Sequence, residues 1–169
     1  LYAAPISRQW LDYLDDQHSF LRALPKDLRK MVLLRLSPHD YGWSQVDRWK
    51  DQMPEIQLND GHDNICSLIK NSRLYIATYN ATTYLESLSW NIPTIMFWNP
   101  THWELNEKAK PYFELLKSAG ILHETPESAA LQMIMIWDSV ESWWKSDKVQ
   151  SARKQFIDFE NVTIKLLLR

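Results

Sequence analysis

The sequence predicts an α/β fold, a three-layer, doubly wound and mainly parallel sheet of about six strands. Short apolar runs alternate along the chain with longer stretches of helical periodicity. Such alternation implies parallel strands joined by right-handed crossovers, with helices on both faces of the sheet. The length of 169 residues corresponds to about one domain of ~150 residues, so residues 1–169 are expected to form a single Rossmann-like domain.

In the first half of the chain, three apolar runs predict strands and three periodic stretches predict helices. The strand at 1–4 is ended by Pro5, and the run at 30–36 is continuous, as expected of a strand covered on both faces. A third strand is expected at 55–58. The helices are expected at 7–24, after Ser44 and after Asp60, because Ser and Asp are preferred at helix starts.

The second half continues the alternation, with strands at 74–77, 92–98 and 121–123. A helix is expected at 81–90 and a helical region at 101–119, where Thr101 and Glu104 have the spacing of a capping box. Pro111 lies inside that region, which is therefore kinked or divided with Pro111 in a first turn. Gly120 suits the position just past the helix end. Long C-terminal helices are expected over about 126–168, the first from Thr125 to about residue 144 and the next from about residue 148.

Composition excludes several classes of function. The single cysteine, Cys66, excludes an internal disulfide framework and favours a cytoplasmic location. Three glycines exclude a GxGxxG or Walker loop, and the net charge of −2 excludes sequence-independent nucleic-acid binding. No apolar run approaches the ~20 residues that span a bilayer. The chain starts at Leu1 and not at a methionine, so we expect it to be a piece of a longer chain.

The turn 78–86, with the sequence TYNATTYLE, is the most informative segment. Ligands of open parallel sheets bind outside the carboxyl ends of the strands. A helix N-terminus there offers free backbone N–H groups and a positive dipole end to an anion, and Asn80, Thr82 and Thr83 add side-chain donors. Glu86, one turn further, has the position to accept both hydroxyls of a ribose. Alternatively, Thr83 and Glu86 form a capping box that needs no ligand.

Residues 59–100 resemble the C-terminal half of a GT-B glycosyltransferase, through the matching pieces NATTYLE (80–86) and NIPTI (91–95). The resemblance implies that Asn80, Ala81, Thr82 and Thr83 meet the diphosphate of a nucleoside diphosphate sugar and that Glu86 meets the ribose. It also places the loop of Asn59, Asp60 and His62 beside the base. Related enzymes usually carry glycine where Asn80 stands, which puts a close approach of phosphate to the backbone in doubt.

The runs RLSPHDYGWSQVDRW (35–49) and WNPTHWELNEKAKPYFELLKSAGILHETPESAA (98–130) resemble transferases of bacterial O-antigen and surface-carbohydrate loci, in which this segment is the C-terminal portion of a larger chain. The resemblance implies a metal-independent glycosyltransferase without a cofactor, with the nucleotide sugar as substrate. The catalytic residues are unknown and the base is expected in a missing N-terminal domain. The fragment alone should therefore bind nucleotide without turnover, and membrane association should come only through the acceptor.

Further candidates follow the other strands. Arg35 could place its guanidinium on the phosphates or bridge to an acid. Trp98, Asn99 and His102 follow the fifth strand, where the resemblance implies contact with the sugar. Both tryptophans of this loop, at 98 and 103, could instead be core residues, and we expect Glu104 to be structural.

The residue patterns also leave other roles open. His39 and Asp40 could form an acid–base pair or an exposed turn. The cluster 60–63 lacks the DxD spacing of metal-dependent glycosyltransferases, so no metal is expected. The alternative functions are a related epimerase or glycerophosphotransferase half-domain, or a flavodoxin-like interaction module without enzymatic activity.

Overall fold

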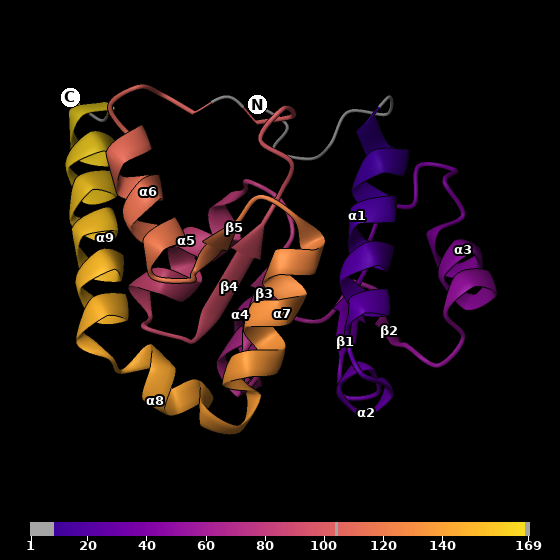
Figure 1. Ribbon diagram of the computed structural model, residues 1–169. Coiled ribbons are helices and arrows are strands. Elements are labelled where there is room, and N and C mark those ends of the chain that lie inside the picture. Colours follow the sequence, from indigo (N-terminus) through magenta and orange to yellow (C-terminus); the bar gives the residue numbers. More distant parts are fainter. Residues whose placement is uncertain (1–8, 104, 168–169) are drawn as a thin grey trace. The chain divides into compact units, whose positions relative to one another are not determined.

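The computed structural model (Figure 1) describes residues 9–103 and 105–167, with side chains up to residue 160. Its contacts divide the chain into two compact units, a larger one of Leu1–Ala23 with Arg73–Arg169 and a smaller one of Leu24–Ser72. The strand expected at 1–4 lies outside the described residues, and the single domain over 1–169 stays a prediction.

The larger unit is built on a parallel sheet in the order β3 (Tyr75–Ala77), β4 (Thr94–Phe97) and β5 (Leu122–His123). In this sheet Ile76 pairs with Ile95 and Met96 with Leu122. All four residues of the central strand β4 are buried. Complete burial is typical of a parallel strand that has helices on both faces of the sheet.

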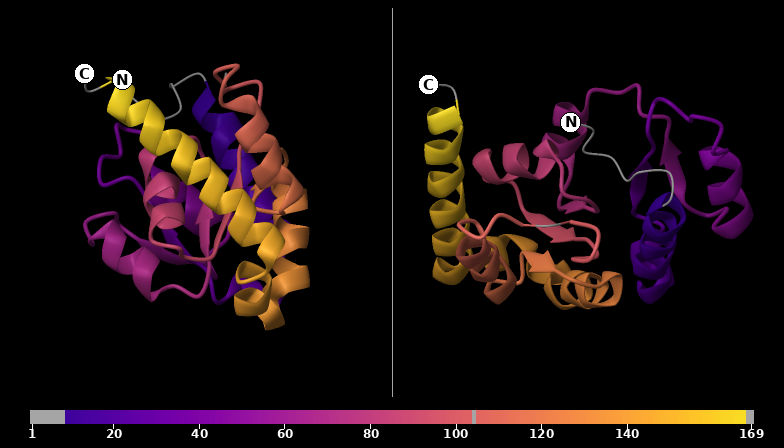
Figure 2. Two further views of the ribbon diagram at one scale, coloured as in Figure 1. Left: turned by 90° about the vertical axis from the view of Figure 1, so that its left-hand side faces the viewer. Right: turned by 90° about the horizontal axis from the view of Figure 1, so that it is seen from above.

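One face of this sheet carries α5 (Thr82–Ser89) and α6 (Lys110–Ser118), and α9 (Asp147–Leu167) packs across both of these helices (Figure 2). On this side the aromatic rings of Phe113 and Phe156 meet edge to face, with centroids 5.0 Å apart. The ring of Trp98 packs against Phe113 at 6.2 Å. Met96 of β4 and Trp98, which directly follows the strand, lie on this face in the same buried cluster.

The other face carries α1 (Trp10–Ala23) and α7 (Pro126–Ile136), which pack against each other (Figure 1). Phe97 points to this side, and its ring stacks on Phe20 of α1 with centroids 5.1 Å apart. The larger unit therefore has the three-layer order of helices, sheet and helices that the sequence predicts.

Several helix ends follow the expected capping signals. The hydroxyl of Thr125 accepts the backbone N–H of Ser128 at 3.2 Å and caps α7. Pro111 stands in the first turn of α6, and Gly120 follows the helix end with φ +73°. However, residues 101–103 and 105–109 form turns and loop, so the helical region expected from residue 101 begins only at Lys110. Glu104, and with it the expected capping box, lies outside the described residues.

The long helix expected from Thr125 is interrupted. After α7 the chain forms a short 3₁₀ helix, η2 (Trp137–Ser139), and then α8 (Val140–Trp144). The buried side chains on this stretch include Ile136, Val140 and Trp144, at four-residue spacing. Because this spacing persists through the interruption, the apolar periodicity alone does not reveal the break.

The smaller unit contains β1 (Leu33–Arg35) and β2 (Gln57–Asn59), a parallel pair in which Leu34 faces Leu58. Its helices are α2 (Lys26–Arg29), α3 (Gln45–Gln52) and α4 (Ile65–Asn71). The expectation that the run 30–36 is covered on both faces is wrong, because Leu33 is 49% exposed.

In the smaller unit one predicted cap is wrong and one predicted helix start is confirmed. Asn64, and not Asp60, caps α4 by accepting the N–H of Ser67 at 3.1 Å. Ser44 stands at the N-cap position of α3, as expected, but its side chain accepts no hydrogen bond there. The carboxylate of Asp40 accepts the N–H groups of Ser44 and Gln45 instead, at 2.9 and 2.8 Å.

The prediction of about six strands in one sheet is wrong for the described residues, which form one sheet of two strands and one of three. The strand–helix alternation reveals where strands occur. It does not reveal which strands share ladder hydrogen bonds, because those bonds join residues far apart in the chain. Among the described residues, no helix is both long and apolar enough to cross a membrane.

Candidate functional site

The turn between β3 and α5 leaves the start of α5 without a side-chain cap. The N-cap position is Ala81, in extended conformation, and no side chain accepts a hydrogen bond there. The first N–H groups of a helix have no partner within the helix, so those of Thr82 and Thr83 are available to an acceptor. Thr82 is exposed and Thr83 half-buried. The N-terminus of α5 therefore presents amide and hydroxyl donors together at the carboxyl end of β3.

Asn80 is held at the edge of this turn. Its side-chain oxygen accepts a hydrogen bond from the hydroxyl of Tyr84 at 3.0 Å. Because Tyr84 belongs to α5, this bond fixes the orientation of the Asn80 amide relative to the helix. The Tyr84 ring is buried, and burial raises the pKa of its hydroxyl, which keeps it a donor to Asn80. The amide nitrogen of Asn80 stays free to donate, because only its oxygen takes part in this bond.

Glu86 lies one turn into α5, and its side chain is exposed. It makes no hydrogen bond or ion pair with any described residue. The alternative capping box with Thr83 does not form, because Ala81 occupies the N-cap position and Thr83 lies inside the helix. The carboxylate is thus free for an external donor.

The loop after β4 has a buried and an exposed part. Trp98 is 4% exposed and belongs to the core, which makes direct stacking of a sugar on its ring unfavourable in this conformation. Asn99 accepts the N–H and the hydroxyl of Thr101 at 3.0 and 2.7 Å, so its side chain organises the loop. His102 and Trp103 are half-buried.

Helix α1 supplies polar groups to this same edge of the sheet, and the sequence did not single them out. The hydroxyl of Tyr13 lies 2.9 Å from that of Thr78, which directly follows β3. Gln17 donates to both hydroxyls, at 2.7 and 3.1 Å. The one sequence signal for this contact is the polar stripe of Tyr13, Asp16 and Gln17 at three- and four-residue steps.

A small cavity of about 10 Å³ opens between α1 and the carboxyl ends of β3 and β4. It has room for about one water-sized group. Its lining joins Tyr13 and Asp16 of α1 to Thr78, Asn99 and His102. These groups come from three segments that are distant in sequence.

Charges around the cavity are mostly acidic. Burial raises the pKa of the Asp16 carboxyl, and its acidic neighbours Glu127, Asp12 and Asp15 raise it further, whereas His102 opposes them. The imidazole of His102 lies 3.7 Å from the carboxylate of Asp12. His102 is thus the one basic group among those that act on Asp16 in the described part of the chain.

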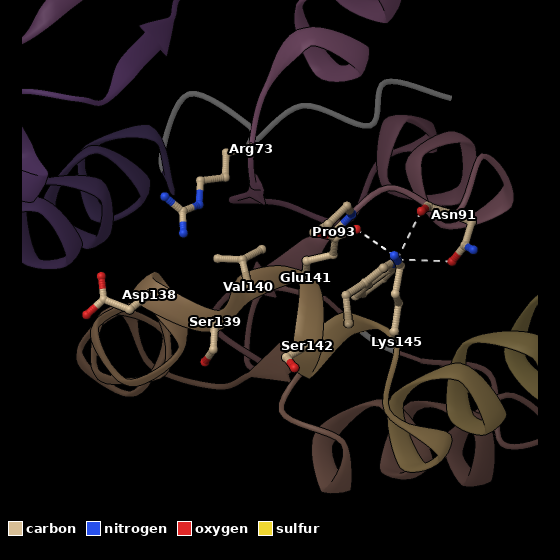
Figure 3. A pocket seen from close by; sticks show the side chains of 10 residues that line it. Arg73, Asn91, Pro93, Asp138, Ser139, Val140, Glu141, Ser142 and Lys145 are labelled. Carbon is tan, nitrogen blue, oxygen red and sulfur yellow. Dashed lines mark hydrogen bonds and ion pairs between the residues drawn. The ribbon is translucent and has the colours of Figure 1, made fainter.

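A second, larger cavity of about 730 Å³ lies at the opposite edge of the sheet, before β3 and β4 (Figure 3). The indole of Trp144 donates there to the backbone and side-chain oxygens of Asn91, at 2.9 and 3.0 Å. Arg73 stacks over Trp137 at 4.7 Å, and Lys145 pairs with Glu141. The cavity contains none of the predicted site residues, and parallel sheets bind ligands at the other edge.

In the smaller unit, Arg35 and the loop expected near the base lie together at the carboxyl ends of β1 and β2. The Arg35 guanidinium donates to the backbone oxygens of Gly61 and Asp63 and forms no ion pair with an acidic side chain of the described residues. Its contact with phosphates stays a prediction. Asn59 donates to the Asp63 carboxylate and accepts the N–H of Gly61 at 3.0 Å. Arg35 therefore orders the loop around Gly61.

The remaining polar candidates in the smaller unit are Asp60 and His62 of this loop and the neighbouring residues His39 and Asp40. Asp60 accepts the N–H of His62 at 3.1 Å, and both residues are exposed. His39 and Asp40 are exposed and do not pair, since the Asp40 carboxylate caps α3. In the described ranges, no group of three or more His, Cys, Asp or Glu side chains is placed to hold a metal ion.

A comparison with models of protein families supports assignment of the chain to a transferase family. The model of the LIC12162 family transferase matches residues 1–167 of the chain. The chain belongs to the LIC12162 family. Comparisons with curated proteins and with solved structures give no match. The candidate site at the start of α5 thus lies in a chain of a transferase family.

Proposed function

We propose that this LIC12162 family chain carries the donor-binding site of a glycosyltransferase of surface polysaccharide synthesis. The N-terminus of α5 binds the diphosphate of a nucleoside diphosphate sugar. Backbone N–H groups and the hydroxyls of Thr82 and Thr83 donate to the phosphate oxygens, and the dipole of α5 favours their negative charge. Asn80 adds an amide donor from the turn.

Glu86 accepts the two ribose hydroxyls in this proposal. The observation that carries the proposal is the combination of an uncapped helix start with an exposed carboxylate one turn away that has no hydrogen bond or ion pair with any described residue. If the segment served only to cap the helix, the first N–H groups of α5 and the Glu86 carboxylate would be hydrogen-bonded within the chain. Hydrogen bonds to a charged group contribute more than neutral ones, so Glu86 is expected to supply a large part of the affinity.

The chemistry that these groups support is stabilisation of a leaving group. When the bond between the sugar and the diphosphate breaks, negative charge develops on the phosphate oxygens that face α5. Donors that are already oriented toward that position stabilise the charge without reorganisation. No metal ion is needed for this step. The base that activates the acceptor is proposed to lie outside this site.

Calorimetric titration of the chain with UDP, CDP and GDP tests the proposal. One of the three is expected to bind, and Thr82→Ala and Glu86→Ala should each weaken its binding at least about tenfold, which is ~1.4 kcal/mol. Ser89→Ala, at the exposed far end of α5, is the matched control and should bind as the wild type does. If none of the three nucleotides binds, the chain is better interpreted as a flavodoxin-like module that mediates protein interaction without enzymatic activity.

A further inference from the structure

We propose that Asp16 and His102 form a subsite for one hydroxyl group of the transferred sugar. The inference rests on the proposed function, because it assumes that the donor diphosphate lies at the start of α5. It adds a helix, α1, that the sequence patterns do not assign to the site. It also predicts which class of sugar the site accepts.

The position of the cavity supports this subsite. Thr78 lines it and precedes Asn80 of the diphosphate turn by two residues. His102 reaches it from the loop after β4, the adjacent strand of the sheet. The cavity and the proposed diphosphate site thus lie at the same end of the sheet, at the carboxyl ends of two neighbouring strands. A sugar joined to a diphosphate at α5 would therefore lie near the cavity.

The size of the cavity limits the ligand group to a small one. Its volume of about 10 Å³ fits one oxygen-sized group and excludes a whole pyranose ring. A ring that lies outside can still insert a single hydroxyl. The half-buried indole of Trp103, which also lines the cavity, offers an apolar surface beside the opening.

Asp16 differs from the other polar residues that line the cavity in its hydrogen bonds. Tyr13 and Thr78 already bond to each other and to Gln17. The Asn99 oxygen is taken by Thr101. Asp16, in contrast, makes no hydrogen bond with any described residue. A half-buried carboxylate in this state is a strong acceptor for a hydroxyl donor, because burial without a partner costs free energy.

The surrounding charges determine the class of sugar. Asp12, Asp15 and Glu127 add negative charge around Asp16, and His102 supplies the opposing group. These acidic side chains would repel an anionic substituent, such as the carboxylate of a uronic acid. The subsite therefore favours a neutral hydroxyl, and a hexose should bind better than the corresponding uronic acid.

Calorimetry on the complete chain tests the subsite separately from the diphosphate site. The probes are UDP, UDP-glucose and UDP-glucuronic acid, or their guanosine or cytidine counterparts if another base binds better. UDP-glucose is expected to bind roughly tenfold more tightly than UDP, the effect of one hydrogen bond to a charged group, and UDP-glucuronic acid no more tightly than UDP.

Asp16→Asn and His102→Gln should abolish this roughly tenfold gain while the affinity for UDP changes less than about twofold. Asp158→Asn, an exposed carboxylate on α9 at the other face of the sheet, is the control and should keep the gain. If Asp16→Asn binds UDP normally and also keeps the gain for UDP-glucose, the subsite is wrong and the diphosphate site stands. If the wild type binds no nucleoside diphosphate, the proposed function fails and the subsite fails with it.

Discussion

The hydroxyl of Tyr13 lies 2.9 Å from the hydroxyl of Thr78, although 65 residues separate them in the chain. Thr78 directly follows β3, so this contact joins α1 to the edge of the sheet where the candidate site lies. Gln17 donates to both hydroxyls and fixes the orientation of the pair. Burial raises the pKa of the Tyr13 hydroxyl, so it stays protonated and able to donate.

Tyr13→Phe should lower the free energy of unfolding by about 1–2 kcal/mol, because the two partly buried hydrogen bonds of the hydroxyl, with Thr78 and Gln17, are lost and the ring is kept. Urea denaturation measures this change. Tyr112→Phe is the matched control, since the Tyr112 ring stacks on Phe159 at 4.2 Å and its hydroxyl bonds to no described residue. An equal loss of stability in both variants would show that the hydroxyl contact with Thr78 contributes nothing.

Gly61→Ala should destabilise the chain more than Gly42→Ala. Both glycines have positive φ, +87° and +79°. A Cβ at Gly61 would meet the backbone oxygen of Leu36 at 2.4 Å and the nitrogen of Pro38 at 2.7 Å, whereas a Cβ at Gly42 meets nothing within 4 Å. Gly42→Ala should cost about 1–2 kcal/mol through its backbone conformation alone.

The clash at Gly61 should add about 1–3 kcal/mol to that cost. Urea denaturation of the two variants, followed by tryptophan fluorescence, gives the comparison directly. Similar midpoints for the two variants would mean that the loop around Gly61 moves away from Leu36 and Pro38 without cost.

The Asp40 cap predicts a pH-dependent contribution to stability. The backbone N–H groups of Gln45 and Ser44 hold the pKa of the Asp40 carboxyl below its usual value of 3.8. Because the folded-state pKa is lowered, the stabilisation is present above the unfolded-state pKa and is lost as the pH falls through the folded-state value. Asp40→Asn should therefore be less stable than the wild type at pH 7, and the two should converge below about pH 4.

Urea denaturation of both proteins between pH 7 and pH 3 measures this convergence. A gap in stability that stays constant with pH would mean that the charge of Asp40 contributes nothing and that its oxygen atoms alone provide the cap.

Local signals in the sequence predicted the local part of the structure. The run 74–98 has its strand, turn, helix and strand within a few residues of the expected bounds, because apolar periodicity and turn residues act over short distances. Thr125 and Pro111 stand at helix starts as expected. For the same reason the donors and the carboxylate at the start of α5 could be predicted from spacing alone.

Non-local relationships could not be predicted in the same way. Asp60 and Ser44 both have the chemistry of a helix cap, but Asn64 and Asp40 fill those roles because the loops place them closer to the free N–H groups. The strands were expected to share one sheet, and their pairing depends on long-range hydrogen bonds. The contribution of Asp16 depends on the packing of α1, which no spacing rule supplies.

The most direct test of diphosphate binding at the start of α5 is the ¹H–¹⁵N NMR spectrum of the labelled chain during titration with the nucleoside diphosphate that binds best. The amide signals of Thr82 and Thr83 should shift strongly and saturate together with the calorimetric binding curve. In Glu86→Ala the same signals should move only at higher ligand concentration. Saturable binding that leaves the Thr82 and Thr83 amides unmoved would contradict a phosphate site at this helix N-terminus.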